Sequence, residues 1–197
     1  MKKIALFVIV LVVGAWLALS IAVELEGPYV EEDLGGPGQA KALVLYHPSR
    51  DAHFSDDLSL ATADGLKAAG YGVTRATLTD RTPARPKGYT LIVVVSNTYY
   101  WTPDLPTLHY LERARLDSIT VLGLIGGAGS TGRSETVLHQ ALRNTGAIVL
   151  PTRSFWLWRP NSDQPTQTAN RRVALDNARR LSQETGAARL AVQAPVR

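Results

Sequence analysis

The chain has 197 residues, 45% of them hydrophobic, which is enough to bury one full core. It contains no cysteine, which excludes disulfides, thiolate nucleophiles and iron–sulfur ligation, and its four histidines lack metal-ligand spacing, so no metal is expected. The formal charge is +4, but residues 41–197 hold 19 basic and 12 acidic side chains, about +7. This excess either forms a solvated surface or favours anionic lipids, acidic partners or phosphate-bearing cofactors; no nucleic-acid partner is expected.

Residues 1–23 are predicted to anchor the chain in a membrane. Lys2 and Lys3 precede twenty residues without a charge, a length that matches the roughly 30 Å hydrocarbon core of a bilayer. A cleaved signal peptide is the alternative, because small residues precede possible cleavage points after Ser20 and Ala22, but apolar signal regions have only about 7–15 residues. The basic N-terminus predicts a single-pass protein of a bacterial inner membrane, with a cytoplasmic N-terminus and a periplasmic domain, secreted if cleaved.

Residues 24–39 are rich in Gly, Pro and acid and are predicted to form a tether without structural elements. The globular domain is expected at residues 40–187, followed by a tail at 188–197. Residues 155–158 either extend the fifth strand or form a surface flap. The strands are expected at residues 42–46, 72–78, 91–95, 119–125 and 147–150, and the helices at 55–69, 105–115, 134–144 and 168–184.

This alternation predicts a three-layer α/β fold, a doubly wound parallel sheet with strand order 2-1-3-4-5. The loops at residues 47–55, 96–101 and 126–133 follow three of its strands. Ligands of open α/β sheets bind outside the carboxyl ends of the strands, so we expect the three loops to form one site.

Three segments carry a resemblance to a known family. They are YHPSRDAHFSDDL with GLKAAGYGV, SNTYYWTPDLPTLHYLER, and GLIGGAGSTGRSETVLHQAL. Together they resemble the flavodoxin-like superfamily, nearest its flavin-dependent NAD(P)H:quinone and FMN reductases. The resemblance implies an FMN-dependent oxidoreductase with NAD(P)H as a donor, a quinone or a protein as redox partner, and a homodimer. The cofactor-binding residues that it and the loop chemistry suggest are His47, Ser49, Arg50, His53, Phe54, Ser55, Asn97, Thr98, Tyr99, Tyr100, Trp101, Gly126, Gly127, Gly129, Ser130 and Thr131.

The first loop joins a strand to a helix N-terminus, where backbone N–H groups and the helix dipole favour an anion such as the FMN phosphate. His53 stands where the family has Ser, and Ser55 where it has Asn. Asp51, Asp56 and Asp57 bring negative charge to the same place, although acids also stabilise a helix start without any ligand.

The other two loops suit the flavin ring. Thr98–Trp101 offers backbone donors and aromatic faces, with Asn97 where the family usually has Pro, and the glycines of residues 126–132 let the backbone approach a ligand closely. Alternatively, the aromatic residues cover the sheet end or bind a partner, and the glycines form a plain turn.

Two functions therefore remain. The first is a membrane-tethered FMN protein that transfers electrons or hydride, for which no catalytic side chain is assigned because the cofactor carries the chemistry. The second is a flavin-free interaction or assembly module at the membrane.

Overall fold

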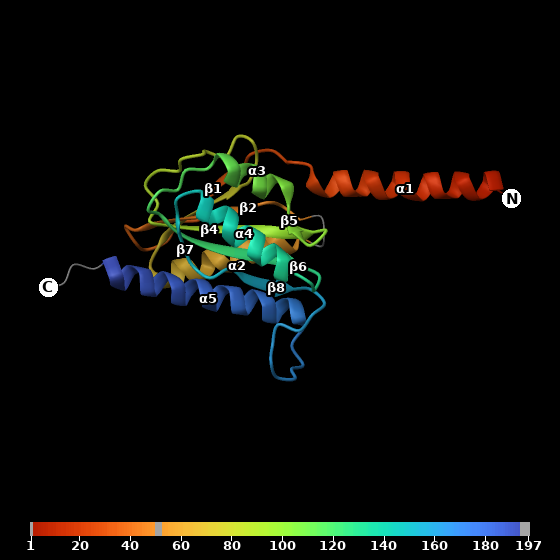
Figure 1. Cartoon of the computed structure of the whole chain (residues 1–197). Coiled ribbons are helices and arrows are strands. Elements are labelled where there is room, and N and C mark those ends of the chain that lie inside the picture. The colour runs from red at the N-terminus through yellow and green to blue at the C-terminus, as the bar shows by residue number, and fades with distance from the viewer. Residues whose placement is uncertain (1, 50–52, 194–197) are drawn as a thin grey trace.

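The computed structural model describes residues 2–49 and 53–193. Arg50 and Asp51, which the sequence suggests at an anion site, lie outside the described residues. Figure 1 shows one α/β domain from which a single helix projects. In chain order the elements are α1 (Lys2–Glu24), β1 (Glu31–Asp33), β2 (Lys41–Tyr46), α2 (Phe54–Ala69), β3 (Gly72–Thr77), β4 (Leu91–Tyr99), β5 (Thr102–Pro103), α3 (Leu105–Arg113), β6 (Thr120–Gly127), α4 (Gly132–Asn144), β7 (Ile148–Val149), β8 (Arg153–Trp156) and α5 (Asn170–Gln193).

The parallel centre of the sheet confirms the predicted topology. The strand order is β1-β3-β2-β4-β6-β7, and β3, β2, β4 and β6 are parallel neighbours, which is the 2-1-3-4 part of the expected order. The fifth strand is divided into β7 and β8, which both pair with β6. Pro151 lies at the interruption, where a residue without a backbone N–H cannot continue the ladder. Of the two alternatives for residues 155–158, extension of the strand holds as far as Trp156.

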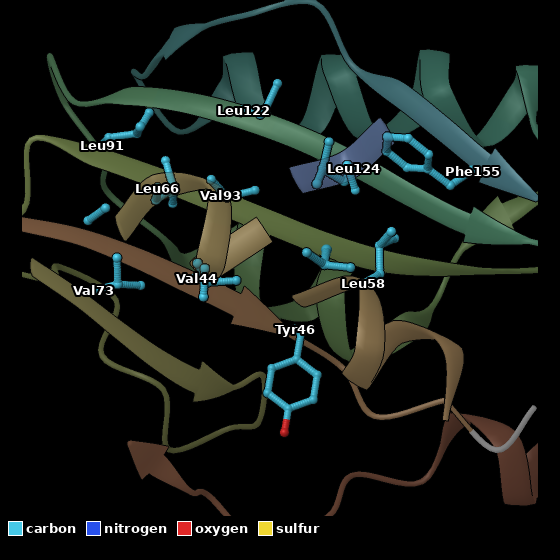
Figure 2. Close-up of a cluster of buried hydrophobic side chains, with 14 of the residues drawn as sticks. Val44, Tyr46, Leu58, Leu66, Val73, Leu91, Val93, Leu122, Leu124 and Phe155 are labelled. Atoms are coloured by element: carbon cyan, nitrogen blue, oxygen red, sulfur yellow. The ribbon is translucent and has the colours of Figure 1, made fainter. Parts of the chain in front are cut away.

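Helices cover both faces of the sheet. Phe54, Leu58 and Leu66 of α2 pack with α5 residues against one face, in the cluster drawn in Figure 2. On the other face, α3 and α4 pack against Leu45 and Ile92. Strands β2, β4 and β6 are buried on both sides, which explains their continuous runs of Val, Leu and Ile.

The prediction of a tether without structure at residues 24–39 is wrong in part. Strand β1 pairs antiparallel with β3, with Glu32 opposite Arg75, and so covers the outer edge of the sheet. The Arg75 guanidinium also forms an ion pair with Glu32 at 3.2 Å. This partner lies 43 residues away along the chain, so local composition gave no sign of it. The predicted tail beginning at residue 188 is also shorter, because α5 continues to Gln193.

Helix α1 is exposed to solvent along nearly its whole length and does not contribute to the core. Its residues Leu6–Glu24 have a mean hydropathy of 2.8, and the helix is long and apolar enough to cross a membrane or to serve as a signal sequence. In Figure 1 it extends away from the domain on the side where β6 and β8 end.

Candidate functional site

The three predicted loops do meet at one edge of the sheet. Tyr46 of β2 lies opposite Val95 of β4, and Asn97 of β4 lies opposite Gly126 of β6, so these strands end side by side. Between the loops is a cleft of about 190 Å³. It is lined by Ser49, Phe54, Asn97, Thr98, Tyr99, Gly126, Gly127, Ala128 and Leu157.

Seven of the sixteen suggested residues thus line the cleft; whether they bind a cofactor stays a prediction. His47, the first residue after β2, and Ser55, in the first turn of α2, are buried, and His53 is exposed at the start of α2. The remaining described residues are not among those that line the cleft: Tyr100, Trp101, Gly129, Ser130 and Thr131.

The loop after β2 (the β2 loop, described at residues 47–49 and 53) is joined to the first turn of α2 by hydrogen bonds of Ser49 and His47. The Ser49 amide donates to Ser55 Oγ at 2.7 Å, and the Ser55 amide donates to Ser49 Oγ at 3.2 Å. Ser55 Oγ also donates to the His47 carbonyl at 2.7 Å, and the Ser55 side chain has no exposed surface. The hydroxyl of Ser55, suggested for a phosphate, is therefore engaged by the backbone of the chain itself.

Arginines compensate the acids at the start of α2. Arg75, only 7% exposed, reaches Asp56 Oδ1 at 3.3 Å and lies over the Tyr46 ring, with its Cζ 3.9 Å from the ring centroid. Asp57 Oδ2 accepts a hydrogen bond from Arg171 Nε at 3.1 Å. The two carboxylates therefore oppose an anion less than their sequence position suggests. Burial raises the pKa of Tyr46 to about 12, although the Arg75 charge works in the opposite direction.

Asp104 is the residue beside the candidate site that sequence reasoning missed. It is completely buried, and its Oδ2 accepts hydrogen bonds from the Asn97 amide at 2.6 Å and from Ser96 Oγ at 2.9 Å. Its Oδ1 accepts from the Thr107 amide at 2.9 Å and so caps α3. The signal was present, since an Asp followed by Leu-Pro at a helix start is an N-cap pattern.

The buried His47 links this carboxylate to the other loops. Its Nδ1 lies 3.4 Å from Asp104 Oδ1 without forming a hydrogen bond, and its Nε2 lies 3.4 Å from the Leu25 carbonyl oxygen. The His47 carbonyl accepts a hydrogen bond from Asn97 Nδ2 at 2.9 Å. His47, Asn97 and Asp104 therefore hold the strand ends in place.

Residues 99–102 form a tight turn, which we call the aromatic hairpin. Strand β5 pairs antiparallel with β4 so that Tyr99 faces Thr102, and the turn consists of Tyr100 and Trp101. Both turn residues have positive φ, 51° and 61°, a conformation that usually selects Gly or Asn. Their side chains are 47% and 61% exposed. Bulky aromatic residues in a strained, exposed turn suggest a functional constraint.

Internal packing explains one of the glycines of residues 126–131, which we call the glycine loop. A Cβ on Gly127 would lie only 2.8 Å from Thr131 Cγ2, whereas a Cβ on Gly126 would make an ordinary contact of 3.4 Å with Phe54 Cδ1. Thr131 Oγ1 in turn accepts a hydrogen bond from Trp156 Nε1 of β8 at 2.8 Å. Packing within the protein therefore explains part of the glycine-rich sequence without a ligand.

The cleft fits the ring of a flavin better than its phosphate. Thr98 lines the cleft, and its Oγ1 is buried and has no hydrogen-bond partner among the described residues, so a rotation of this side chain would offer the hydroxyl to the polar edge of a ligand. The cleft is smaller than the roughly 300–1,000 Å³ of typical ligand pockets. In the described part of the β2 loop, the hydroxyls that would hold a phosphate already bind the backbone.

The described residues contain no group of three or more His, Cys, Asp or Glu side chains placed to hold a metal ion.

Comparison with known proteins shows that the fold is flavodoxin-like. No protein-family model matches the chain, and no curated protein matches it in sequence. Similar solved structures include a flavodoxin from the domain Archaea, with 16% identity and a TM-score of 0.59, covering 76% of this chain and 99% of that one. A flavodiiron protein from Giardia intestinalis has 15% identity and a TM-score of 0.62, covering 81% and 39%. A flavodoxin, WrbA-like protein from Agrobacterium tumefaciens has 12% identity and a TM-score of 0.55, covering 77% and 98%.

Proposed function

We propose that this chain is a membrane-anchored redox protein that holds FMN non-covalently in the cleft at the carboxyl edge of its sheet. The observation that supports this most is the buried, unpartnered Thr98 Oγ1 in the wall of a cleft formed by three strand ends. A bound flavin would supply the ability to accept electrons and pass them on. Thr98 and the backbone of the glycine loop would orient the ring, while Leu157 and Phe54 would exclude water.

The anchor is part of the proposal. Trp16 and Ser20 of α1 both contact Tyr100, and Glu24 Oε2 accepts a hydrogen bond from the Leu105 amide at 2.7 Å. Cleavage after Ser20 or Ala22 would remove Trp16 and Ser20, so these contacts favour a retained membrane helix. The basic N-terminus would then place the domain outside the cytoplasm, where NAD(P)H is scarce. A quinone or a protein partner at the membrane is therefore the redox partner that we favour.

The closed β2 loop favours a second candidate, a flavin-free interaction module. In flavin binding, this loop would have to offer polar groups to a phosphate, yet the Ser55 hydroxyl is buried and bound to the His47 carbonyl and the Ser49 amide. In the module, the exposed aromatic hairpin would be the contact surface.

Flavin retention distinguishes the two. The full chain is purified in detergent, mixed with FMN, freed of unbound cofactor, and measured by visible absorption. We expect a retained flavin spectrum, and about fivefold to tenfold weaker affinity in Thr98→Val, because that variant cannot hydrogen-bond to the ring. Thr136→Val is the matched control, because Thr136 is exposed on α4 and, among the described residues, its hydroxyl bonds only the Gly132 carbonyl.

Folded protein that retains no flavin would exclude the redox proposal and leave the interaction module. A parallel titration with riboflavin, which lacks the phosphate, shows how much the β2 loop contributes. If the loop stays closed, riboflavin should bind within about tenfold of FMN, because a phosphate held by charge-assisted hydrogen bonds would contribute more.

A further inference from the structure

The aromatic hairpin lies beside the body of α1, well before the end of that helix. The Tyr100 ring packs edge-on against Trp16, with ring centroids 5.5 Å apart, and the Tyr100 hydroxyl forms a hydrogen bond with Ser20 Oγ. Helix α1 ends at Glu24. At a rise of about 1.5 Å per residue, Trp16 lies about 12 Å and Ser20 about 6 Å before that end. The tip of the hairpin is therefore level with the apolar part of the helix.

Two exposed tryptophans lie at this same edge of the domain. Trp101 is 61% exposed at the hairpin tip, and Trp158 is 81% exposed. The Trp158 amide donates to the Ala128 carbonyl at 2.9 Å, which places Trp158 next to the glycine loop. Figure 1 shows that α1 projects from this side of the domain. Trp and Tyr side chains are enriched at membrane–water interfaces, where an apolar ring and a polar group are both satisfied.

The hairpin also carries little that would resist contact with lipid. Residues 96–106 contain no lysine or arginine, and their single acid, Asp104, is completely buried. The flanking strands pair Thr98 with Pro103 and Tyr99 with Thr102, and the Tyr100 hydroxyl is bonded to Ser20. Insertion of the tip into the headgroup layer would thus bury no exposed charge.

We propose that the aromatic hairpin inserts into the interfacial layer of the membrane that α1 crosses, so that the cleft opens at the lipid surface. Interfacial segments enter the boundary between the headgroups and the acyl chains by about 5–10 Å. The 6–12 Å between the helix end and the contacts with Ser20 and Trp16 is comparable. The inference requires that α1 crosses the membrane, and it does not require a bound flavin.

One consequence concerns how a ligand reaches the cleft. Thr98 and Tyr99 line the cleft and directly precede the hairpin tip. A flat, apolar ring dissolved in the bilayer would reach them without crossing water, whereas a water-soluble dinucleotide would have to approach through the headgroups.

The absence of cysteine allows a direct test with single labels. Full-length Trp101→Cys, Leu105→Cys and Lys87→Cys variants are labelled with an environment-sensitive nitrobenzoxadiazole dye and reconstituted without flavin in phosphatidylcholine/phosphatidylglycerol vesicles. Leu105 is 45% exposed beside the hairpin, and Lys87 is exposed before the amino end of β4, at the opposite edge of the sheet. Emission is recorded with brominated lipids and with aqueous iodide as quenchers.

We expect the label at position 101 to emit at shorter wavelength, to be quenched by brominated lipid, and to be several-fold less quenched by iodide than the label at position 87. Position 105 should be intermediate. Equal iodide quenching at positions 101 and 87 would overturn the proposal. If Trp101→Cys fails to fold, position 105 alone decides: quenching by iodide equal to position 87, and none by brominated lipid, would also overturn it. Because flavin is absent, neither result depends on the redox function.

Discussion

The β2 loop and the aromatic hairpin follow neighbouring strands at the same edge of the sheet, but they use their chemistry in opposite ways. Ser49 of the β2 loop and Ser55 in the first turn of α2 bind each other's backbone, and the nearby acids Asp56 and Asp57 are paired with arginines. In the hairpin, Tyr100 and Trp101 occupy strained backbone and expose their rings. The difference shows that some residues of one predicted site stabilise the fold through internal hydrogen bonds, whereas others remain exposed and available to a partner.

The largest expected effect comes from the residue that joins the two regions. Asp104→Ala would leave the Asn97 amide and Ser96 hydroxyl without their buried acceptor and would remove the cap of α3. We expect the free energy of unfolding to fall by about 3 to 5 kcal/mol. Denaturant unfolding of the full chain in detergent measures this, with Asp104→Asn as the milder companion. A loss below about 1 kcal/mol would mean that the loops are held without this carboxylate.

Tyr46, the last residue of β2, is expected to make the protein less stable at alkaline pH. Tyr46 has a folded-state pKa of about 12, compared with 10 for an unperturbed tyrosine, so the folded state keeps its proton longer than the unfolded state. The resulting stability is complete below pH 10 and is lost as the pH rises from 10 to about 12, by up to about 3 kcal/mol.

Tyr46→Phe isolates this contribution, because its unfolding midpoint should fall less steeply than that of the parent chain over the same pH range. Parallel curves for the two proteins would show that Tyr46 ionises as easily in the fold as in the unfolded chain.

A substitution in the glycine loop tests whether Gly127 is required by close packing against Thr131 and Thr98. Gly127→Ala would bring a Cβ to 2.8 Å from Thr131 Cγ2 and 3.2 Å from Thr98 Cβ, so we expect a destabilisation of about 1 to 3 kcal/mol. Adding Thr131→Ser should recover much of it, because serine lacks that methyl group but keeps the Oγ that Trp156 binds. Gly132→Ala, which meets no atom within 4 Å, is the control. Tolerance of Gly127→Ala without the second change would contradict the packing explanation.

The smallest expected effect is a gain at the hairpin. Trp101→Gly should stabilise the chain by about 0.5 to 1 kcal/mol, because φ of 61° is strained for tryptophan and not for glycine. Thermal unfolding measures the gain. Trp158→Gly is the control, because Trp158 is also an exposed tryptophan but is not among the described residues with positive φ. A net loss in Trp101→Gly would indicate that the indole is packed and that the hairpin is not held for a partner.

Much of the architecture was accessible from local patterns. The uninterrupted Leu91–Val95 run is buried on both sheet faces, and Gly70 ends α2 with a φ of 105°, as its place after an apolar helix predicted. The apolar N-terminal helix follows from twenty uncharged residues. These features depend on residues close together in the sequence or on whether a strand is buried on one or both faces. The spacing of hydrophobic residues along the chain indicates both.

The chemistry of the site was less accessible. The sequence indicated that three loops would meet, because parallel strands end at one edge, and the structure brings Ser49, Thr98 and Gly127 to one cleft. It did not indicate that Ser55 would turn inward, since that depends on a carbonyl at residue 47 and an amide at residue 49. A hydroxyl in a loop suits a ligand and the backbone equally well, and only the fold decides between them.

By itself, the sequence determined the doubly wound sheet, the apolar N-terminal helix and the edge at which the loops gather. Only the tertiary structure decided that β1 closes the sheet beside β3, that Asp104 joins the loops, and that Tyr100 meets Trp16. The physical reason is distance along the chain. Hydrophobic periodicity reports burial, whereas these contacts join polar or aromatic groups whose partners are set by strand register and by the packing of distant segments.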